Sequence, residues 1–170
     1  AMRAQHGRRF PWVSLGTVFL VQGVLMWLVA MPLLYAARAE AGLIGPLAAL
    51  GIAVWAVGFA WETVADAQMA RFKADSANRG RVMDRGLWRY TRHPNYFGEI
   101  VLWWGFYLVG AAAGGWWTAV SAALMTVLLA RVSGVPMLEA DLPERRPGYA
   151  EYVRRTNALI PGPPTVDGGQ

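Results

Sequence analysis

The segment from Gly86 to Glu99 holds the residues best suited to chemistry, and it reads GLWRYTRHPNYFGE. Its last eleven residues include two arginines, one histidine, one asparagine, two tyrosines and one glutamate. The segment runs into an apolar stretch and carries Glu99 to the mouth of an expected membrane helix. A carboxylate at that depth is costly unless it has a partner or a function. The pattern predicts a site for an anionic ligand at the cytosolic edge of a membrane.

A second charged group, Glu62, Asp66 and Lys73, stands at positions i, i+4 and i+11 of an expected helix. This spacing places the three residues on one face of the helix. Ionised carboxylates only accept hydrogen bonds, so the two acids suit hydroxyls and amide nitrogens of a ligand. Lys73 suits a phosphate. A solvated helix face with ordinary ion pairs has the same spacing, and both interpretations stay open. No third ligand at fixed spacing supports a metal ion.

The loop between these two groups is rich in arginine. A guanidinium binds phosphate through a planar, two-pronged set of donors, so several together suit a diphosphate or a 2′-phosphate. Contact with lipid headgroups explains a basic loop equally well, and charge alone does not separate the two interpretations. The arginines of this loop are Arg79, Arg81, Arg85, Arg89 and Arg92.

His93, Pro94 and Asn95 introduce the next helix, which is expected to begin near Tyr96. A residue before proline favours extended backbone, and asparagine suits the N-cap of a helix. The free amides at a helix start favour an anion. Glu99 then lies about one turn into the apolar segment, where it serves either a ligand or a structural ion pair.

Long apolar runs dominate the 170-residue chain, of which 55% is hydrophobic. A membrane helix needs about 20 apolar residues to cross a hydrocarbon layer of about 30 Å. Four runs approach this length, and Gly114-Gly115 forms a tight turn between the last two. We therefore predict an all-α, polytopic membrane protein with four transmembrane helices; a soluble helical hairpin is the alternative. The runs cover residues 14–37, 41–61, 97–113 and 116–130.

The basic residues predict the orientation of these spans. They gather before the first span, between the second and third, and after the fourth, which leaves only Arg38 on the other face. Loops rich in Lys and Arg stay cytoplasmic, so both termini and residues 66–95 are expected inside. The net charge of +5 therefore reflects membrane topology. The sequence shows no soluble module with a basic patch and an element that reads nucleic acid. The absence of Cys excludes disulfides, thiolate nucleophiles and Cys-ligated metals.

The remaining segments are expected to be helical or loose. Pro32 should kink the first span. The second span should continue as a polar helix over residues 62–74 and project into the cytosol. After a break at residues 133–136, residues 137–157 are expected to form an interfacial helix. We predict one membrane domain over residues 1–164 and a flexible tail over residues 165–170.

Together, these motifs resemble the C-terminal part of the steroid 5-alpha-reductase family, especially its bacterial membrane branch. The resemblance covers nearly the whole chain, and the run from Gly86 to Glu99 is its most specific part. The resemblance implies an enzyme of the bacterial inner membrane that binds NADPH and reduces an activated carbon–carbon double bond of a lipidic or steroid-like 3-oxo-4-ene. The other matching pieces are Glu62-x-x-x-Asp66-x-Gln68, Asn78-Arg-Gly-Arg81, Ser133-Gly-Val-Pro-Met-Leu-Glu139, Tyr149-x-x-Tyr152 and Ile160-Pro161.

By resemblance, Glu62 and Asp66 hold nicotinamide or ribose hydroxyls, and the basic residues contact phosphates. Asn95 and Glu99 match the cofactor-contacting residues of the family. Glu99 is also a possible catalytic residue. The Tyr and Glu that polarise the substrate carbonyl in the family would come from helices upstream of those in this chain. The residues expected to bind the cofactor are Glu62, Asp66, Lys73, Arg81, Tyr90, Arg92, His93, Asn95, Glu99, Arg131, Glu139 and Tyr152.

Two other functions compete with the reductase. The related isoprenylcysteine carboxyl methyltransferases, which bind S-adenosylmethionine, share an Arg-His-Pro-x-Tyr-x-Gly pattern and a Tyr-x-x-Tyr. The spacing from Asn95 to Glu99, together with Glu62 and Asp66, favours the reductase. A non-catalytic membrane relative is the third hypothesis, and the missing upstream helices support it. In each case the expected partners are membrane lipids and, for an enzyme, a small hydrophobic substrate.

Overall fold

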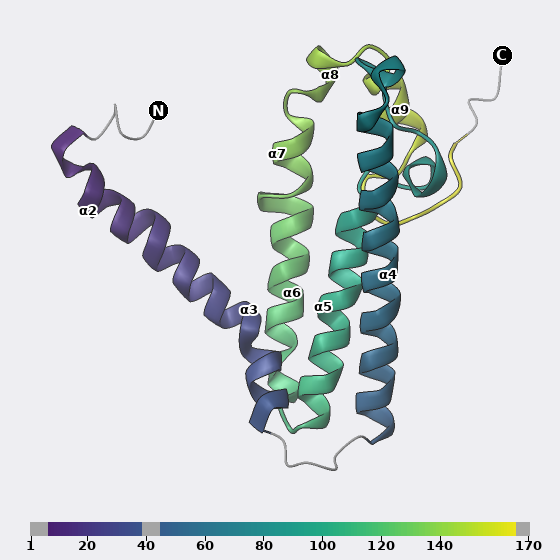
Figure 1. Cartoon of the computed structure of the whole chain (residues 1–170). Coiled ribbons are helices and arrows are strands. Elements are labelled where there is room, and N and C mark those ends of the chain that lie inside the picture. Colours follow the sequence, from purple (N-terminus) through teal and green to yellow (C-terminus); the bar gives the residue numbers. More distant parts are fainter. Residues whose placement is uncertain (1–6, 39–44, 166–170) are drawn as a thin grey trace.

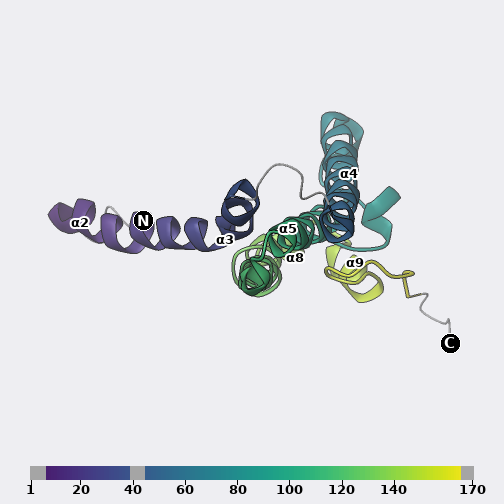
Figure 2. The same ribbon diagram turned by 90° about the horizontal axis from the view of Figure 1, so that it is seen from below.

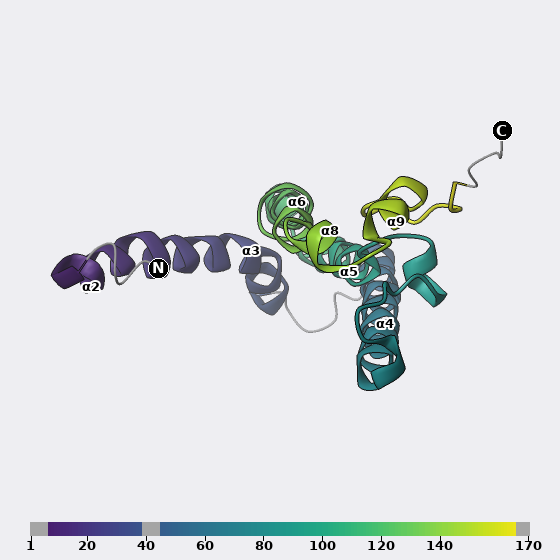
Figure 3. The same cartoon turned by 90° about the horizontal axis from the view of Figure 1, so that it is seen from above.

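The computed structural model describes residues 7–38 and 45–165, and every regular element in these ranges is helical. Viewed along the bundle in Figures 2 and 3, α5 lies between α4 and α6. In chain order the helices are α2 (Phe10–Ser14), α3 (Val21–Arg38), α4 (Pro46–Ala74), α5 (Pro94–Ala112), α6 (Ala119–Val127), α7 (Val135–Glu139), α8 (Leu142–Arg145) and α9 (Tyr149–Arg155). Short 3₁₀ helices cover Gly7–Arg9, Ser76–Asn78, Gly86–Arg89 and Trp116–Thr118, and π-helical stretches cover Leu15–Leu20 and Leu128–Val132.

Three helical stretches of the described ranges are long and apolar enough to cross a membrane: Gly7–Arg38, Pro46–Ala74 and Trp116–Arg145. They correspond to the first, second and fourth predicted spans and indicate an integral membrane protein. The third predicted span forms α5, whose first turns carry Asn95 and Glu99 and are therefore less apolar. Because α5 is not apolar enough to be one of these three stretches, the presence of four spans stays a prediction.

The charged segments gather at one end of the bundle. Figure 1 shows that α4 ends, α5 begins and α7 to α9 lie at this same end. The basic loop between α4 and α5 therefore meets the basic C-terminal residues, as the predicted topology requires. Which side of the membrane this end faces stays a prediction. The outer turn predicted over residues 37–45 lies mostly outside the described residues.

Helices α4 and α5 approach closely because glycines stand where they touch. Gly51 and Gly58 of α4, and Gly98 and Gly105 of α5, are each seven residues apart and all buried. A Cβ atom at Gly51 would lie 2.8 Å from the backbone nitrogen of Val109. Small residues at such contacts let the backbones of membrane helices approach. We call these four residues the glycine seam.

Pro32 lies inside α3 and is fully buried. Figure 1 shows that α3 bends, so that the part before the bend forms an arm that leaves the bundle. Sharp kinks of this kind are typically caused by proline. Because proline has no N–H, the carbonyl of Leu28 loses its helical donor. The hydroxyl of Ser121 in α6 donates to that carbonyl over 2.5 Å, so the kink is tied to a neighbouring helix.

The arm exposes large apolar side chains. The exposed fraction of Trp12 is 74% and that of Met26 is 72%. In a membrane protein such a surface faces lipid. The exposed apolar side chains of the arm therefore agree with the prediction that the protein contacts membrane lipids.

Two predicted boundaries are wrong. α5 begins at Pro94 with His93 as its N-cap, two residues before the expected start, because proline suits the first helical position. Asn95 is therefore inside the helix rather than at its cap. The single helix predicted over residues 137–157 is replaced by the last turn of α7 and by α8 and α9, since Pro147 and Gly148, with φ of 84° at Gly148, interrupt it.

The polar extension of α4 to Ala74 is confirmed. Of the predicted tail, only Thr165 belongs to the described residues, and its backbone N–H donates to the carbonyl of Arg155 over 2.9 Å. Residues 166–170 lie outside the described part of the chain, so the flexible tail stays a prediction there.

The glycine seam predicts a stability effect for Gly51→Ala. The added methyl group would meet the backbone of α5, which cannot move away without separating the helices. Overpacking of this kind costs about 1–3 kcal/mol, so we expect a lower melting temperature in detergent. The control is Gly23→Ala in α3, where a Cβ meets nothing within 4 Å. Equal melting temperatures for the two variants would contradict the close helix contact.

Candidate functional site

A pocket of about 450 Å³ opens at the charged end of the bundle. Its walls come from the end of α4, the loop before α5, the first turn of α5, and α7 to α9. This volume falls within the range of about 300–1,000 Å³ that is typical of small-molecule sites. The pocket is therefore the candidate functional site.

The loop before α5 is fixed to α4 by two hydrogen bonds. The side-chain oxygen of Gln68 accepts from the backbone N–H of Leu87 over 2.9 Å. The indole N–H of Trp88 donates to the carbonyl of Ala65 over 3.0 Å. Trp88 and Ala65 are both buried, so the second of these bonds is shielded from water. The loop is consequently a fixed wall of the pocket.

The C-terminal segment is fixed to the same loop. The hydroxyl of Thr91, which is fully buried, contacts the carbonyls of Ala158 and Leu159 at 3.0 Å each. The backbone N–H of Arg92 donates to the carbonyl of Asn157 over 2.8 Å. The phenol of Tyr152 donates to the carbonyl of Trp88. These contacts join segments about 65 residues apart in the chain.

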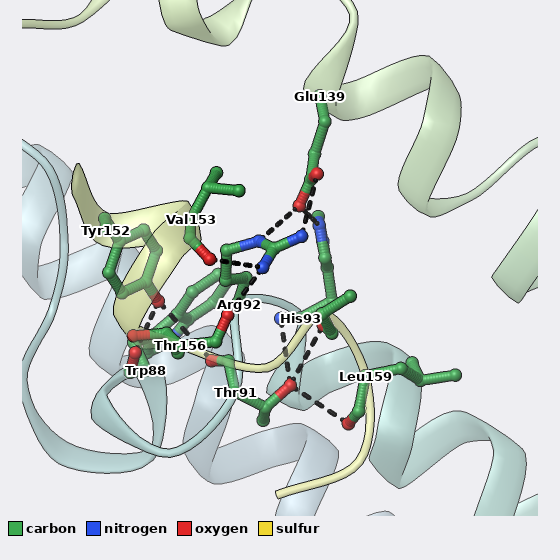
Figure 4. A network of polar contacts seen from close by, with 10 residues as sticks. Trp88, Thr91, Arg92, His93, Glu139, Tyr152, Val153, Thr156 and Leu159 are labelled. Carbon is green, nitrogen blue, oxygen red and sulfur yellow. Dashed lines mark hydrogen bonds and ion pairs between the residues drawn. The ribbon is translucent and has the colours of Figure 1, made fainter. Parts of the chain in front are cut away.

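Arg92, His93 and Glu139 form a cluster of charged or ionisable residues beside the pocket, and Figure 4 shows their contacts. The guanidinium of Arg92 donates to both carboxylate oxygens of Glu139, over 2.8 and 3.0 Å. It also donates to the carbonyl of Thr156 over 2.5 Å and to that of Val153 over 3.3 Å. His93 Nε2 lies 2.8 Å from the same carboxylate. We call this group the clamp.

The clamp is largely buried, since the side chains of Arg92 and Glu139 are 9% and 19% exposed. Burial alone would lower the pKa of Arg92, but the hydrogen bonds and charge of Glu139 raise it above its usual value. Removing one partner of such a pair typically costs about 3–5 kcal/mol because the other charge stays buried. The clamp therefore holds α7, α9 and the loop together.

Four cations face the pocket from three segments: Lys73 on α4, Arg81 in the loop, Arg145 on α8 and Arg146 after it. None of them forms an ion pair with an acid in the described part of the chain. The ion pairs there join Arg92 and His93 to Glu139, and Arg155 to Asp84. Arg146 instead donates to the carbonyl of Arg81, which brings two of the cations together. We call these four residues the cation wall.

The remaining pocket lining is polar or apolar. The side-chain oxygen of Asn95 is buried and has no hydrogen-bond partner among the residues that the structure describes. Asp66 and Asp141 contribute two carboxylates. Burial raises the pKa of the Tyr149 phenol to about 12, and the charge of Glu139 adds to this effect. Tyr149 is therefore a neutral hydrogen-bond donor at physiological pH. Methionine and leucine side chains complete the surface, namely Met69, Met83, Met137, Leu138 and Leu142.

Three carboxylates lie near one another beside the pocket. Glu62 and Asp66 of α4 are close enough to Glu99 of α5 to repel it. Glu99 forms no ion pair within the described ranges. For those ranges, this excludes the interpretation that Glu99 serves a structural ion pair. In those ranges no group of acids and histidines has the arrangement of a metal site.

Seven of the twelve predicted cofactor-binding residues line the pocket, although Arg92, His93 and Tyr152 are also held by the contacts described above. Tyr90 and Arg131 are exposed and lie outside its lining. Glu62, Glu99 and Glu139 are partly buried next to it. The seven lining residues are Asp66, Lys73, Arg81, Arg92, His93, Asn95 and Tyr152.

The cofactor-residue prediction left out part of the pocket. Arg145, Arg146, Asp141 and Tyr149 line it but were not selected. The two arginines were assigned to membrane topology, and charge alone gives no sign that they face inward. The Pro147-Gly148 pair is the available signal, because it predicts a turn that folds this segment back.

Comparison with known proteins identifies the family. The family described as "Protein of unknown function (DUF1295)" matches residues 1–156. The chain belongs to this family. It is a steroid 5-alpha-reductase-like group, in agreement with the resemblance of the motifs. No curated protein and no solved structure matches the chain.

The clamp predicts a stability effect for Arg92→Lys. Lysine keeps the charge but lacks the planar fork that reaches both oxygens of Glu139 and two carbonyls. We expect a loss of about 1–3 kcal/mol, measured as thermal unfolding, and faster cleavage of the C-terminal segment by proteinase K. Arg89→Lys is the control, since Arg89 is exposed and its side chain forms no hydrogen bond or ion pair within the described residues. Equal protease resistance of both variants would contradict a structural role for Arg92.

Proposed function

We propose that this protein is an NADPH-dependent membrane reductase of an activated carbon–carbon double bond in a lipidic or steroid-like substrate. The observation that carries the proposal is the cation wall. It presents four cations without acidic partners to one pocket, at the end of a bundle of apolar helices. Arg and Lys in such a set suit a ligand with several phosphate charges. NADPH carries three phosphate groups, whereas S-adenosylmethionine has none.

The residues present fit this cofactor. Lys73, Arg81, Arg145 and Arg146 would hold its phosphates. Asn95 offers a buried, unpartnered amide oxygen, as expected of a residue that hydrogen-bonds a ligand. When bound, NADPH supplies a hydride. The residues of the chain would bind and orient it and exclude water, which is the usual contribution of a protein to cofactor chemistry.

Glu99 would lie near the reacting end of such a ligand. It is on the same helix as Asn95 and about one turn further into the bundle. The clamp and the carbonyl contacts of Thr91 would keep the pocket closed to water on the side of the C-terminal segment. A lipidic substrate would approach from the apolar side of the helices, because the opposite side of the pocket is charged.

The proposal predicts binding and hydride transfer by NADPH. A ligand present at 100 times its Kd stabilises the folded state by about 2.7 kcal/mol, so NADPH should raise the melting temperature of the full chain in detergent. S-adenosylhomocysteine should not. Tritium from the transferable position of labelled NADPH should then appear at the former β-carbon of the saturated ketone formed from a steroid 3-oxo-4-ene, while the α-carbon takes a proton. Stabilisation by S-adenosylhomocysteine alone would support a methyltransferase, and indifference to both ligands would support a non-catalytic relative.

The cation wall predicts which substitutions weaken binding. Lys73→Gln and Arg145→Gln each remove one charged donor, and a hydrogen bond to a charged group contributes about 1.5–3 kcal/mol. Each variant should therefore raise the Kd for NADPH about tenfold or more, measured by fluorescence titration. Arg85→Gln is the matched control, because Arg85 is exposed and does not line the pocket. Equal effects of all three variants would indicate general electrostatic attraction instead of a built phosphate site.

A further inference from the structure

His93 is almost entirely buried, with 4% of the residue exposed, yet it lines the pocket. It is the N-cap of α5, and its ring stacks on that of Tyr96 with centroids 5.5 Å apart and planes at 11°. Nε2 lies 2.8 Å from a carboxylate oxygen of Glu139. The ring is thus held on one face by a tyrosine and at one edge by an acid.

The charge state of Glu139, which Arg92 maintains, determines which nitrogen of the His93 imidazole carries the proton. The two N–H···O bonds from Arg92 keep this carboxylate ionised, and an ionised carboxylate only accepts. Nε2 must therefore carry a proton and donate it to Glu139. In a neutral imidazole one nitrogen is a donor and the other an acceptor, and the bond made by one fixes the role of the other. Nδ1 is then the acceptor.

Nδ1 is the ring nitrogen that Glu139 leaves free. It has no hydrogen-bond partner in the part of the chain that the structure describes, and it is not among the enclosed atoms that lack a partner. It therefore keeps an accessible surface, which for this buried residue lies on the pocket that it lines. Two residues further on, the side-chain oxygen of Asn95 also lacks a partner among the described residues, but this atom is enclosed and offers no surface to the pocket.

We propose that Glu139 is a positioning residue that fixes His93 with Nε2 protonated, so that Nδ1 forms an acceptor subsite for a hydrogen-bond-donating group such as a carboxamide. The groups in contact with the ring are Glu139, which Arg92 holds in the clamp, and Tyr96 on α5. The choice of a nicotinamide carboxamide as the ligand group rests on the proposed function. The tautomer of the His93 imidazole does not depend on that proposal.

Glu139 suits a positioning role better than a binding role. It lies outside the pocket lining and reaches a ligand only through its two partners. Its bond to His93 spans 46 residues of the chain, so the fold, not local sequence, places the acid behind the ring. Arg92 holds both carboxylate oxygens and prevents the acid from turning away.

Nitrogen-15 NMR of the imidazole tests the inference on the full chain in detergent. The sequence holds only two histidines, so His6→Gln leaves the signals of His93 alone. In alkaline buffer we expect a protonated Nε2 and an unprotonated Nδ1. Glu139→Ala should convert this state into a mixture of tautomers, whereas Glu144→Ala, at an exposed acid of α8, should not. A proton on Nδ1, or an unchanged tautomer in Glu139→Ala, would overturn the positioning role.

A ligand pair then tests the acceptor subsite. NADP⁺ should shift the Nδ1 resonance, and the analogue with a carboxylate in place of the carboxamide should bind at least tenfold more weakly. If NADP⁺ binds but Nδ1 does not shift, or if both ligands bind equally, the subsite is wrong while the proposed function survives. If NADP⁺ does not bind, the proposed function and the carboxamide assignment both fail, and the tautomer measurement alone judges Glu139.

Discussion

The glycine seam is the constraint on which the rest of the structure depends. Its four residues allow the backbones of α4 and α5 to touch, and a Cβ at Gly98 would lie 2.6 Å from the backbone nitrogen of Glu62. Because the seam runs up to Glu62, it fixes the carboxylates of α4 beside Glu99 of α5. The same contact brings the polar end of α4 next to the start of α5. A bulkier seam would separate the walls of the pocket before any polar contact could join them.

Polar contacts then complete what the seam begins. The helix contact leaves the end of α4 and the loop unsupported on one side, and backbone groups there need partners. Gln68 and Trp88 join the loop to α4, while Thr91 and the clamp join the C-terminal segment to the loop. The pocket is the space enclosed by these successive attachments. Its shape therefore depends on contacts between segments far apart in the sequence, whereas its charge is already present in the sequence.

This difference explains what could be predicted from the sequence. Hydropathy and polar periodicity were sufficient for the end of α4 at Ala74, and motif resemblance selected Asn95, which lines the pocket. The glycine seam was missed because a glycine in an apolar helix gives no sign of what it faces. The bonds of Arg92 and His93 to Glu139 were missed for another reason. They join residues 46 and 47 positions apart, which only the folded chain brings together.

The arginines of this site divide into two kinds, and the division has an energetic basis. Arg92 is buried, so it needs the carboxylate and the carbonyls that surround it, since an unpaired buried charge is unstable. Arg145 is exposed at the pocket rim, where water solvates it and no acidic partner is required. Paired charges thus build the pocket, whereas solvated charges remain available to a ligand. An arginine count along the sequence treats both kinds alike; only their partners in the fold show which arginines are free to contact a ligand.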